Sequence, residues 1–299
     1  MRFDVGIIIE GGVGKHIAFS AALSEARKRY GEIVLVSAYP EVFVGNESVA
    51  RNLSFSFPYL YEDYLKDIKL FKLEPYLEDE YRLQKKHIID VFASRLGIEC
   101  ERKPEVKILQ QEEQEFLAFR EKVLENKNYL VIQIRGGTPP LNPELAKQKA
   151  HFTRDYPEEL AQKFVDLFRK KYPDWYIVQI GLPTEPKLHD CVYLTNLPVR
   201  AYFPVLKYCN TFVVIDSFLN HLSAALGKRG VVLWGGTNPS NLGYEHNINL
   251  YDTSLCEEIF CGRPGVFDHS WKCKRNFSCM RIQPELILEK VSSLIDAKV

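Results

Sequence analysis

Side chains that could bind a phosphate follow the apolar run Thr211–Ile215. Asp216 and Ser217 come directly after this predicted buried strand, and His221 lies near the start of the helix expected to follow. The free N–H groups and the dipole at the start of a helix bind anions, so a phosphate could be held here. Asp216 and Ser217 are equally typical of plain helix caps, and His221 of a buried core residue. The spacing alone leaves both interpretations open.

A second candidate for phosphate binding follows the apolar run at residues 129–134. Arg135 and Gly136 come next in the chain. An arginine can neutralise a phosphate, and a glycine lets the backbone approach it closely. An ordinary loop turn with a surface arginine has the same pattern, so the sequence supports phosphate binding and a plain turn equally.

A glycine-rich turn ends the first apolar run of the chain and leads into Lys15 and His16. It is not a P-loop, because the first glycine of that motif is missing and His16 stands where Ser or Thr would bind magnesium. It is not a dinucleotide fingerprint either, because Ile17 stands where the third glycine after Gly12 and Gly14 would be. We expect these two glycines to line a ligand crevice, with a plain tight turn as the alternative.

The elements that position these residues form two successive α/β series, which predicts parallel sheets. We expect a Rossmann-like N-terminal domain at residues 1–125, a Rossmann-like C-terminal domain at 126–282, and a final helix at 283–299 that could pack back on the N-terminal domain. The two domains would leave a central cleft between them. Ligands bind at the carboxyl ends of parallel strands, so the residues that follow the strands are the candidates for a site in this cleft. The expected strands are 5–10, 32–37, 129–134, 175–180, 211–215 and 230–234; the expected helices are 17–30, one capped by Asp155 and ending near 171, 199–208, 219–226 and 284–297, with helices and weaker strands in the more polar stretch 60–125.

The composition is that of a packed globular protein without an obvious nucleic-acid surface. The chain has 299 residues, 46% of them hydrophobic and 26% charged. Lys+Arg and Asp+Glu both number 39, and this zero net charge argues against a dedicated nucleic-acid binder. We find no pattern of a secretory signal and no apolar run long enough to span a bilayer. We therefore expect a cytoplasmic protein whose seven cysteines are reduced.

The stretch from Asp216 to Gly227 resembles the signature of glycosyltransferase family 9, the family of ADP-heptose–lipopolysaccharide heptosyltransferases. That signature reads Asp-Ser/Thr-Gly-x-x-His-Leu-x-Ala-Ala-Leu-Gly, and this chain departs from it only at Phe218, where the family has Gly. The next strand is followed by Trp234-Gly-Gly-Thr237-Asn-Pro, similar to the family's Phe/Trp-Gly-x-Thr-x-Pro loop. The resemblance adds Thr237 to the donor-binding candidates.

Three further segments resemble the family in the expected order. They are Arg154–Glu159, Gly181–Glu185 and Cys279–Glu285. The resemblance covers the C-terminal half well and the N-terminal half only in its opening strand, turn and helix. It implies that Arg154 binds the donor phosphates, that Glu185 contacts the ribose, and that Asp216 and His221 orient the donor or its loop.

The resemblance implies a GT-B fold and an enzyme that needs no metal for its chemistry. Such an enzyme moves a heptose or hexose-like sugar from a nucleotide-diphosphate donor to a hydroxyl group of a glycan, lipid-linked molecule or protein. Gly12 and Gly14 would lie on the acceptor side. Two alternatives stay open: a transferase that acts on modified DNA bases, and an inactive nucleotide-sugar-binding protein.

Lys15 is the main departure from the family, which has an aspartate proposed as the catalytic base at this position. An ammonium cannot serve as a base unless its pKa is lowered. Three hypotheses follow. His16 or Glu10 replaces the base, Lys15 itself binds phosphate in a changed acceptor chemistry, or catalysis is lost.

Four of the seven cysteines lie close together near the C-terminus: Cys256, Cys261, Cys273 and Cys279. Four thiolates could bind a structural zinc or iron tetrahedrally. The spacing lacks the short paired knuckles of common zinc sites, so partly buried thiols are the alternative. Related protein-modifying heptosyltransferases carry a cysteine-bound metal in this region, so the resemblance adds weight to a structural site and leaves both interpretations open.

Overall fold

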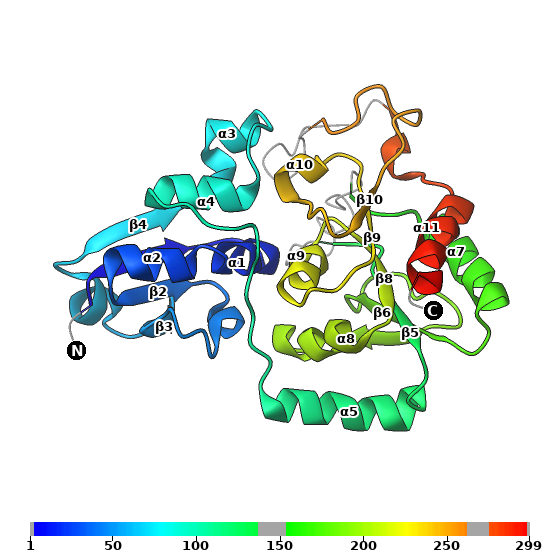
Figure 1. Cartoon of the computed structure of the whole chain (residues 1–299), viewed down its shortest axis with the longest axis horizontal. Coiled ribbons are helices and arrows are strands. Elements are labelled where there is room, and N and C mark those ends of the chain that lie inside the picture. The colour runs from blue at the N-terminus through cyan, green and yellow to red at the C-terminus, as the bar shows by residue number, and fades with distance from the viewer. Residues whose placement is uncertain (1–2, 137–153, 262–274, 298–299) are drawn as a thin grey trace.

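The protein contains two sheets in which all strands are parallel (Figure 1). The computed structural model describes residues 3–136, 154–261 and 275–297. The N-terminal sheet has four strands in the order β3 (Arg51–Ser54), β2 (Ile33–Ser37), β1 (Val5–Ile9) and β4 (Lys69–Leu73). The C-terminal sheet has six, in the order β10 (Ile248–Leu250), β9 (Val231–Leu233), β8 (Thr211–Ile215), β5 (Tyr129–Ile132), β6 (Tyr176–Gly181) and β7 (Val192–Thr195).

Both sheets have the strand order of a Rossmann-like fold, in which the direction of winding reverses once. The reversal falls between β1 and β4 in the N-terminal sheet and between β5 and β8 in the C-terminal sheet. Ile9 pairs with Leu73 at the first of these switch points, and Ile132 pairs with Val213 at the second. Ligands of open α/β sheets bind beside the carboxyl ends of the strands at such points. The expected fold class, two Rossmann-like domains with parallel sheets, is confirmed.

The central strands form because their side chains are apolar on both faces. All residues of β2, β5 and β8 are buried, as expected for strands covered by helices on both sides. The helices of the N-terminal half are α1 (Val13–Ser20), α2 (Leu23–Tyr30), α3 (Asp79–Arg82) and α4 (Ile88–Leu96). Those that follow are α5 (Gln110–Leu124), α7 (Glu158–Lys171), α8 (Tyr202–Tyr208), α9 (Phe218–Ala225), α10 (Pro239–Leu242) and α11 (Pro284–Asp296).

The prediction of one helix over residues 17–30 is wrong, because the chain forms two helices there. At Ala21 and Ala22 the backbone N–H groups bond to carbonyls three residues back, which tightens the turn and ends α1. The Ser20 hydroxyl also accepts the backbone N–H of Glu105 at 2.7 Å. The helix starts earlier than expected, at Val13, so Gly14, Lys15 and His16 lie in its first turns.

The sequence predicts that Asp155 caps the helix that follows it, and this prediction is wrong. Pro157 occupies the N-cap position of α7, and no side chain caps that helix. The Asp155 carboxylate instead accepts the backbone N–H of Gly136 at 3.3 Å. A supposed capping residue is therefore part of the strand-end region described below.

The final helix packs on the C-terminal sheet, so the suggestion that it returns to the N-terminal domain is wrong. Its principal contacts are with α7, β8 and β9. The apolar residues Ile287, Val291 and Leu294 share one buried cluster with Phe164 and other side chains of α7. The apolar face of this helix is therefore buried against the C-terminal half.

Helix α5 also belongs spatially to the C-terminal half, although the expected range 1–125 assigns it to the N-terminal domain. Phe116 stacks on Tyr208 of α8, with ring centroids 5.7 Å apart. The buried guanidinium of Arg200 donates to both carboxylate oxygens of Glu112 in α5. With 15 residues, α5 is too short to cross a membrane, and no other helix within the described ranges is long and apolar enough to do so.

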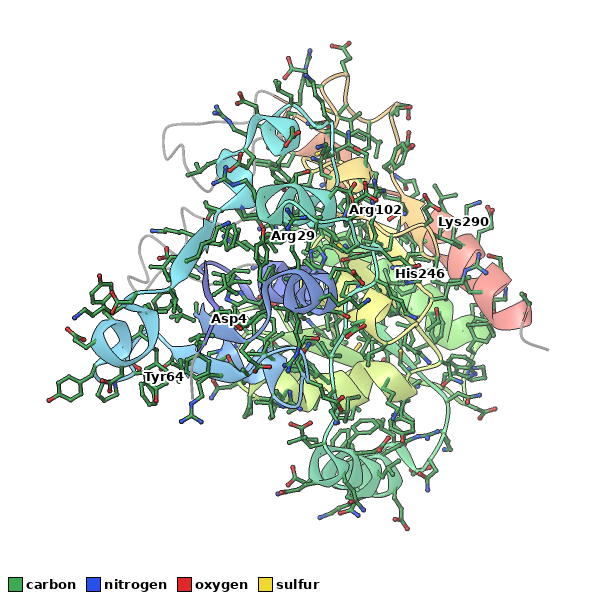
Figure 2. All side chains as sticks on the ribbon, turned by 60° about the vertical axis from the view of Figure 1, so that its left-hand side comes forward. Asp4, Arg29, Tyr64, Arg102, His246 and Lys290 are labelled. Atoms are coloured by element: carbon green, nitrogen blue, oxygen red, sulfur yellow. The ribbon has the colours of Figure 1, made fainter. Side chains whose placement is uncertain are left out.

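Figure 2 shows that Tyr64 and Lys290 lie near opposite ends of the molecule. Tyr64 contacts Phe3, which precedes the amino end of β1, with ring centroids 6.0 Å apart. The aromatic side chains around Tyr64 therefore lie toward the amino edge of the N-terminal sheet. The two switch points open on the other edge, where the two halves meet.

Candidate active site at the junction of the two sheets

The two halves contact each other through α1 and α9, the helices that follow β1 and β8. Gly14 makes this contact possible, because a Cβ atom there would lie 2.8 Å from His221 Cδ2 and 3.2 Å from the Phe218 Cα. Both helices start at a switch point. Their close approach therefore brings the carboxyl ends of the two sheets together (Figure 1).

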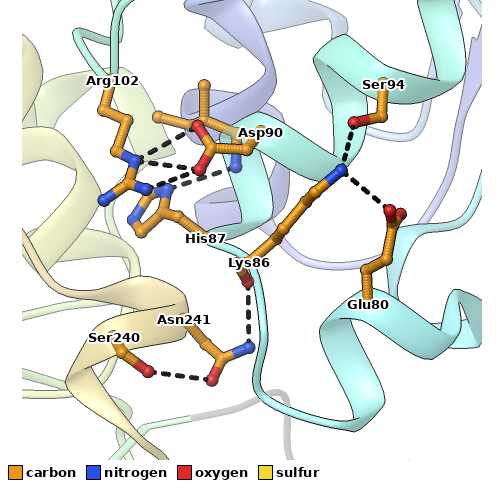
Figure 3. Close-up of polar contacts among 9 residues, drawn as sticks. Glu80, Lys86, His87, Asp90, Ser94, Arg102, Ser240 and Asn241 are labelled. Carbon is orange, nitrogen blue, oxygen red and sulfur yellow. Dashed lines mark hydrogen bonds and ion pairs between the residues drawn. The ribbon is translucent and has the colours of Figure 1, made fainter.

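A second contact between the halves joins the segment around α3 to the segment around α10. Asn241 donates from Nδ2 to the backbone carbonyls of Tyr81 and Lys86, both at 3.1 Å, and Figure 3 shows the bond to Lys86. Asn238 donates to the side chain of Gln84 at 2.7 Å. These bonds use side chains on one half and mostly backbone on the other, and they hold the loop after β9 beside the N-terminal half.

Arg154 and Asp216 form the charged centre on the C-terminal side of the junction. Arg154 Nη1 lies 3.5 Å from Asp216 Oδ2 and 3.4 Å from the Asp216 carbonyl oxygen. Asp216 is 3% exposed. Within the described ranges, Asp216 Oδ2, Arg154 Nε and Thr237 Oγ1 are buried without a hydrogen-bond partner. Buried polar atoms normally find partners, so the neighbouring Arg154 and Asp216 atoms are free to contact a polar ligand.

Ser217 starts α9 and connects it to β5 across the switch point. Its hydroxyl accepts the backbone N–H of Leu219 at 3.2 Å and donates to the Gln133 side chain. Gly136 lies close by, because a Cβ atom there would be 3.1 Å from Ile215 and 3.7 Å from Ser217 Cβ. The turn at Gly136 therefore lies beside the start of α9.

Glu185 and Asp155 are two carboxyl groups with raised pKa values beside the same turn. Burial raises the pKa of Glu185 to about 7, and the charge of Asp155 adds to this, while the Leu182 backbone and Arg135 oppose it. Burial raises the pKa of Asp155 to about 6, against the Gly136 N–H and two arginines. Glu185 Oε2 has no hydrogen-bond partner among the described residues. A half-protonated carboxyl group at neutral pH can both accept and donate a hydrogen bond.

His221 is buried in α9 and held by the C-terminal half. Its Nδ1 lies 2.8 Å from the hydroxyl of Tyr244. Burial lowers the pKa of His221 to about 4, and Asp216 only partly opposes this. His221 is therefore neutral at physiological pH and cannot contribute a charge to phosphate binding.

On the N-terminal side of the junction, Lys15 forms an ion pair with Glu74. Lys15 Nζ lies 2.7 Å from Glu74 Oε2, and the two side chains are 2% and 30% exposed. The same ammonium lies 4.9 Å from the centre of the Tyr76 ring. Glu74 follows β4, whose end is level with that of β1. The pair therefore bridges the N-terminal switch point.

The other two candidates for a replacement base lie in different surroundings. His16 is fully buried between Tyr39 and Phe43, and its Nδ1 is 2.9 Å from the Gly12 carbonyl. Burial lowers the pKa of His16 to about 4. Glu10 is exposed and lies 3.6 Å from Lys72. Of Glu10, Lys15 and His16, Lys15 is the one that carries a charge from within α1, the helix that contacts α9.

Tyr76 and Tyr81 are junction residues that the sequence did not single out. Burial raises the pKa of Tyr76, and the charges of Asp216, Arg154 and Glu74 influence it further. Tyr81, whose ring centroid is 5.0 Å from that of Tyr76, responds to the same Asp216 and Arg154 charges. The N-terminal segment after β4 thus lies next to the charged centre of the C-terminal half.

The cysteine hypothesis is only partly covered by the described residues. Cys256 and Cys279 are buried in the same apolar cluster of the C-terminal half, and Cys261 is partly exposed. Within residues 3–136, 154–261 and 275–297 no group of three or more potential ligands is arranged to hold a metal ion. Cys273 lies outside these ranges, so the four-thiolate site stays a prediction from the sequence.

The whole structure is similar to solved glycosyltransferases. The glycosyl transferase family 9 structure from Veillonella parvula DSM 2008 matches with a TM-score of 0.70 and 15% identity, over 99% of each chain. The dodecameric iron-containing heptosyltransferase TibC, in complex with ADP-D-β-D-heptose, matches with a TM-score of 0.70 and 13% identity, over 100% of this chain and 79% of TibC. E. coli heptosyltransferase WaaC with ADP matches with a TM-score of 0.59 and 12% identity, over 98% and 100%.

No protein-family model and no curated protein matches the sequence. At identities this low the structural likeness establishes the fold and does not by itself establish an activity. The chain has the GT-B fold of these glycosyltransferases, with both of its sheets included in the match.

Proposed function

We propose that this protein is a glycosyltransferase that uses a nucleoside-diphosphate sugar as donor. The observation that carries the proposal is the pair of Arg154 and Asp216 at the C-terminal switch point, whose Nε and Oδ2 atoms are buried without a hydrogen-bond partner among the described residues. A pyrophosphate and its sugar offer the charge and the hydrogen bonds that these atoms lack. The described partners of the similar structures, ADP and ADP-heptose, support an adenosine diphosphate donor.

In this proposal the C-terminal half stabilises the leaving nucleoside diphosphate. Arg154 and the positive end of the α9 dipole would stabilise the developing negative charge, which lowers the free energy of the transition state. Arg135 lies close enough to influence Asp155 and Glu185, and it adds positive charge at the same turn. Asp216 holds Arg154 in place through their ion pair.

Glu185 would contact the ribose of the donor. Its Oε2 is buried without a partner among the described residues, and a ribose hydroxyl would supply one. The N-terminal half would present the hydroxyl group of the acceptor beside Gly12 and Gly14. The contacts of Asn241 with Tyr81 and Lys86 would hold the two halves together around the donor.

The test is a thermal-shift measurement with ADP, UDP, GDP and CDP, each compared with its monophosphate. Ligand at about 100 times its dissociation constant stabilises the folded state by about 2.7 kcal/mol. We expect ADP to raise the melting temperature more than AMP does, because AMP lacks the second phosphate that Arg154 would neutralise. Absence of a shift with every nucleoside diphosphate would contradict a donor site.

A further inference from the structure

Building on the proposed transferase function, we propose that Glu74 is the general base that accepts the proton of the acceptor hydroxyl, and that Lys15 positions it. The pairing of Lys15 Nζ with Glu74 Oε2 at 2.7 Å carries the inference. The pair places the Glu74 carboxylate beside the first turn of α1, the turn in which α1 itself carries the Lys15 ammonium.

The fold explains why a residue 59 positions away reaches Lys15. β1 and β4 are parallel neighbours with Ile9 opposite Leu73, so their carboxyl ends coincide. Glu74 is the next residue after β4, and its Oε1 accepts the backbone N–H of Tyr76 at 3.4 Å. Two contacts therefore fix the carboxylate at the N-terminal switch point.

The exposure of the pair suits a base on the carboxylate and not on the amine. The Lys15 side chain is 2% exposed, whereas the Glu74 side chain is 30% exposed. Lys15 also lies over the Tyr76 ring, which leaves its ammonium surrounded by protein. A substrate hydroxyl can therefore approach the carboxylate, whereas the ammonium is enclosed and can only hold the carboxylate in position.

The position of Glu74 relative to the donor site follows from Tyr76. The charges of Glu74, Asp216 and Arg154 all act on the Tyr76 phenol, so the carboxylate and the donor-side ion pair are both near this residue, and α1, which carries Lys15, packs on α9. A sugar bound between them would have its leaving group toward Arg154 and its acceptor toward Glu74.

The proposed step is a displacement at the anomeric carbon of the sugar. The acceptor oxygen forms a bond to the anomeric carbon of the sugar while the bond from that carbon to the phosphate oxygen breaks. The electron pair of the broken bond leaves with the nucleoside diphosphate, whose charge Arg154 neutralises. The proton of the acceptor hydroxyl passes to a carboxylate oxygen of Glu74.

The experiment compares Glu74→Gln with Glu78→Gln. Glu78 is a matched control, because its side chain is 29% exposed and pairs with Arg95 at 3.2 Å, also within the N-terminal half. ADP binding is measured by thermal shift, and the chemical step by single-turnover release of ADP from ADP-D-β-D-heptose with water as the acceptor. We expect Glu74→Gln to bind ADP like the wild type but to release it about 10²- to 10⁴-fold more slowly, and Glu78→Gln to behave like the wild type.

The exchange variant Lys15→Asp/Glu74→Lys supplies a second measurement. It moves the carboxylate onto α1 and keeps the ion pair, so we expect it to recover at least about tenfold of the rate lost in Glu74→Gln. ADP release by Glu74→Gln at the wild-type rate, or an equal loss in Glu78→Gln, would overturn the assignment. Wild-type protein that binds ADP but forms no ADP from ADP-D-β-D-heptose would also overturn the assignment while leaving the donor site intact. Failure to bind any nucleoside diphosphate would instead refute the proposed function itself.

Discussion

The two switch points are built from the same elements but treat their charges differently. Each consists of a buried strand, a short turn and a helix of eight residues, α1 in one half and α9 in the other. α1 begins after Gly12 without a side-chain cap, whereas Ser217 caps α9 through the N–H of Leu219. The charged residue at the first is Lys15, and the charged residue at the second is Asp216.

The difference lies in how completely each charge is paired. Lys15 has a carboxylate at 2.7 Å, whereas Asp216 has only the longer contact to Arg154 at 3.5 Å. In the described part of the C-terminal half, Asp216, Arg154 and Thr237 each keep a buried polar atom without a partner. The charge at the N-terminal switch point is thus closely paired, although His16 Nε2 there also lacks a partner among the described residues, whereas at the C-terminal one the charged residues themselves retain hydrogen-bonding capacity for a ligand. This comparison predicts that ligand affinity depends on the C-terminal residues.

Arg154→Gln should have the largest effect. It removes the positive charge that would meet the pyrophosphate and leaves Asp216 buried without its ion pair. We expect ADP to bind about 100-fold more weakly, measured by isothermal titration calorimetry. Arg281→Gln is the control, because Arg281 is an exposed arginine of the same half that pairs with Glu159 at 3.0 Å. Equal ADP affinity in both variants would break the comparison.

Gly14→Ala should have the next largest effect, on stability. The added Cβ would lie 2.8 Å from His221 Cδ2 and 3.2 Å from the Phe218 backbone, so α1 and α9 would have to separate. Overpacking of this kind costs roughly 1–3 kcal/mol of unfolding free energy, measurable by urea denaturation. Gly12→Ala is the matched control, because a Cβ there meets nothing within 4 Å and its φ is −79°. A similar loss in both variants would show that the junction is loosely packed.

The sequence predicts the central strands well because burial on both faces leaves a continuous apolar run. The predicted strand 211–215 coincides with β8, and 32–37 differs from β2 by one residue. The strands left without predicted bounds, β3, β4, β7 and β10, are the four at the edges of the two sheets. An edge strand is covered less completely, and its mixed polar and apolar residues give no clear pattern.

This explains why the sequence offered candidates beside central strands and did not offer Glu74. Arg135, Asp216 and Ser217 follow central strands, so the ends of those strands could be located. Glu74 follows β4, an edge strand in which Lys69 and Leu70 are exposed. The partner of Lys15 therefore could not be found from spacing, because the ion pair depends on which strand lies next to β1.

Glu185→Gln tests the donor half through its pH dependence. The folded-state pKa of Glu185 is raised from 4.5 to about 7, so the folded protein binds this proton more tightly than the unfolded chain does. The carboxyl group therefore contributes a loss of stability that is absent below pH 4.5 and complete above pH 7. We expect Glu185→Gln to stabilise the protein by about 1 kcal/mol at pH 8, after allowance for solvent screening, and to change little at pH 4.

Melting temperatures of the wild type and Glu185→Gln across this range provide the measurement. The Asp155 carboxyl group, whose pKa is raised to about 6, stays in both proteins and contributes equally to each curve. A stability difference that does not grow between pH 4 and pH 8 would show that Glu185 is solvated in the folded state. The comparison would then lose one of its unpartnered donor-side atoms.

Tyr244→Phe should have the smallest effect and separates packing from ligand binding at the C-terminal switch point. The variant removes the hydroxyl that lies 2.8 Å from His221 Nδ1. We expect a loss of about 1 kcal/mol, the typical net contribution of one buried hydrogen bond, measured by urea denaturation. Tyr251→Phe is the control, because Tyr251 is 42% exposed. His221 is neutral and held by its own half, so ADP should still raise the melting temperature of Tyr244→Phe. Loss of that rise would show that the orientation of His221 determines donor binding. The C-terminal switch point would then be less preformed than its mostly buried side chains indicate.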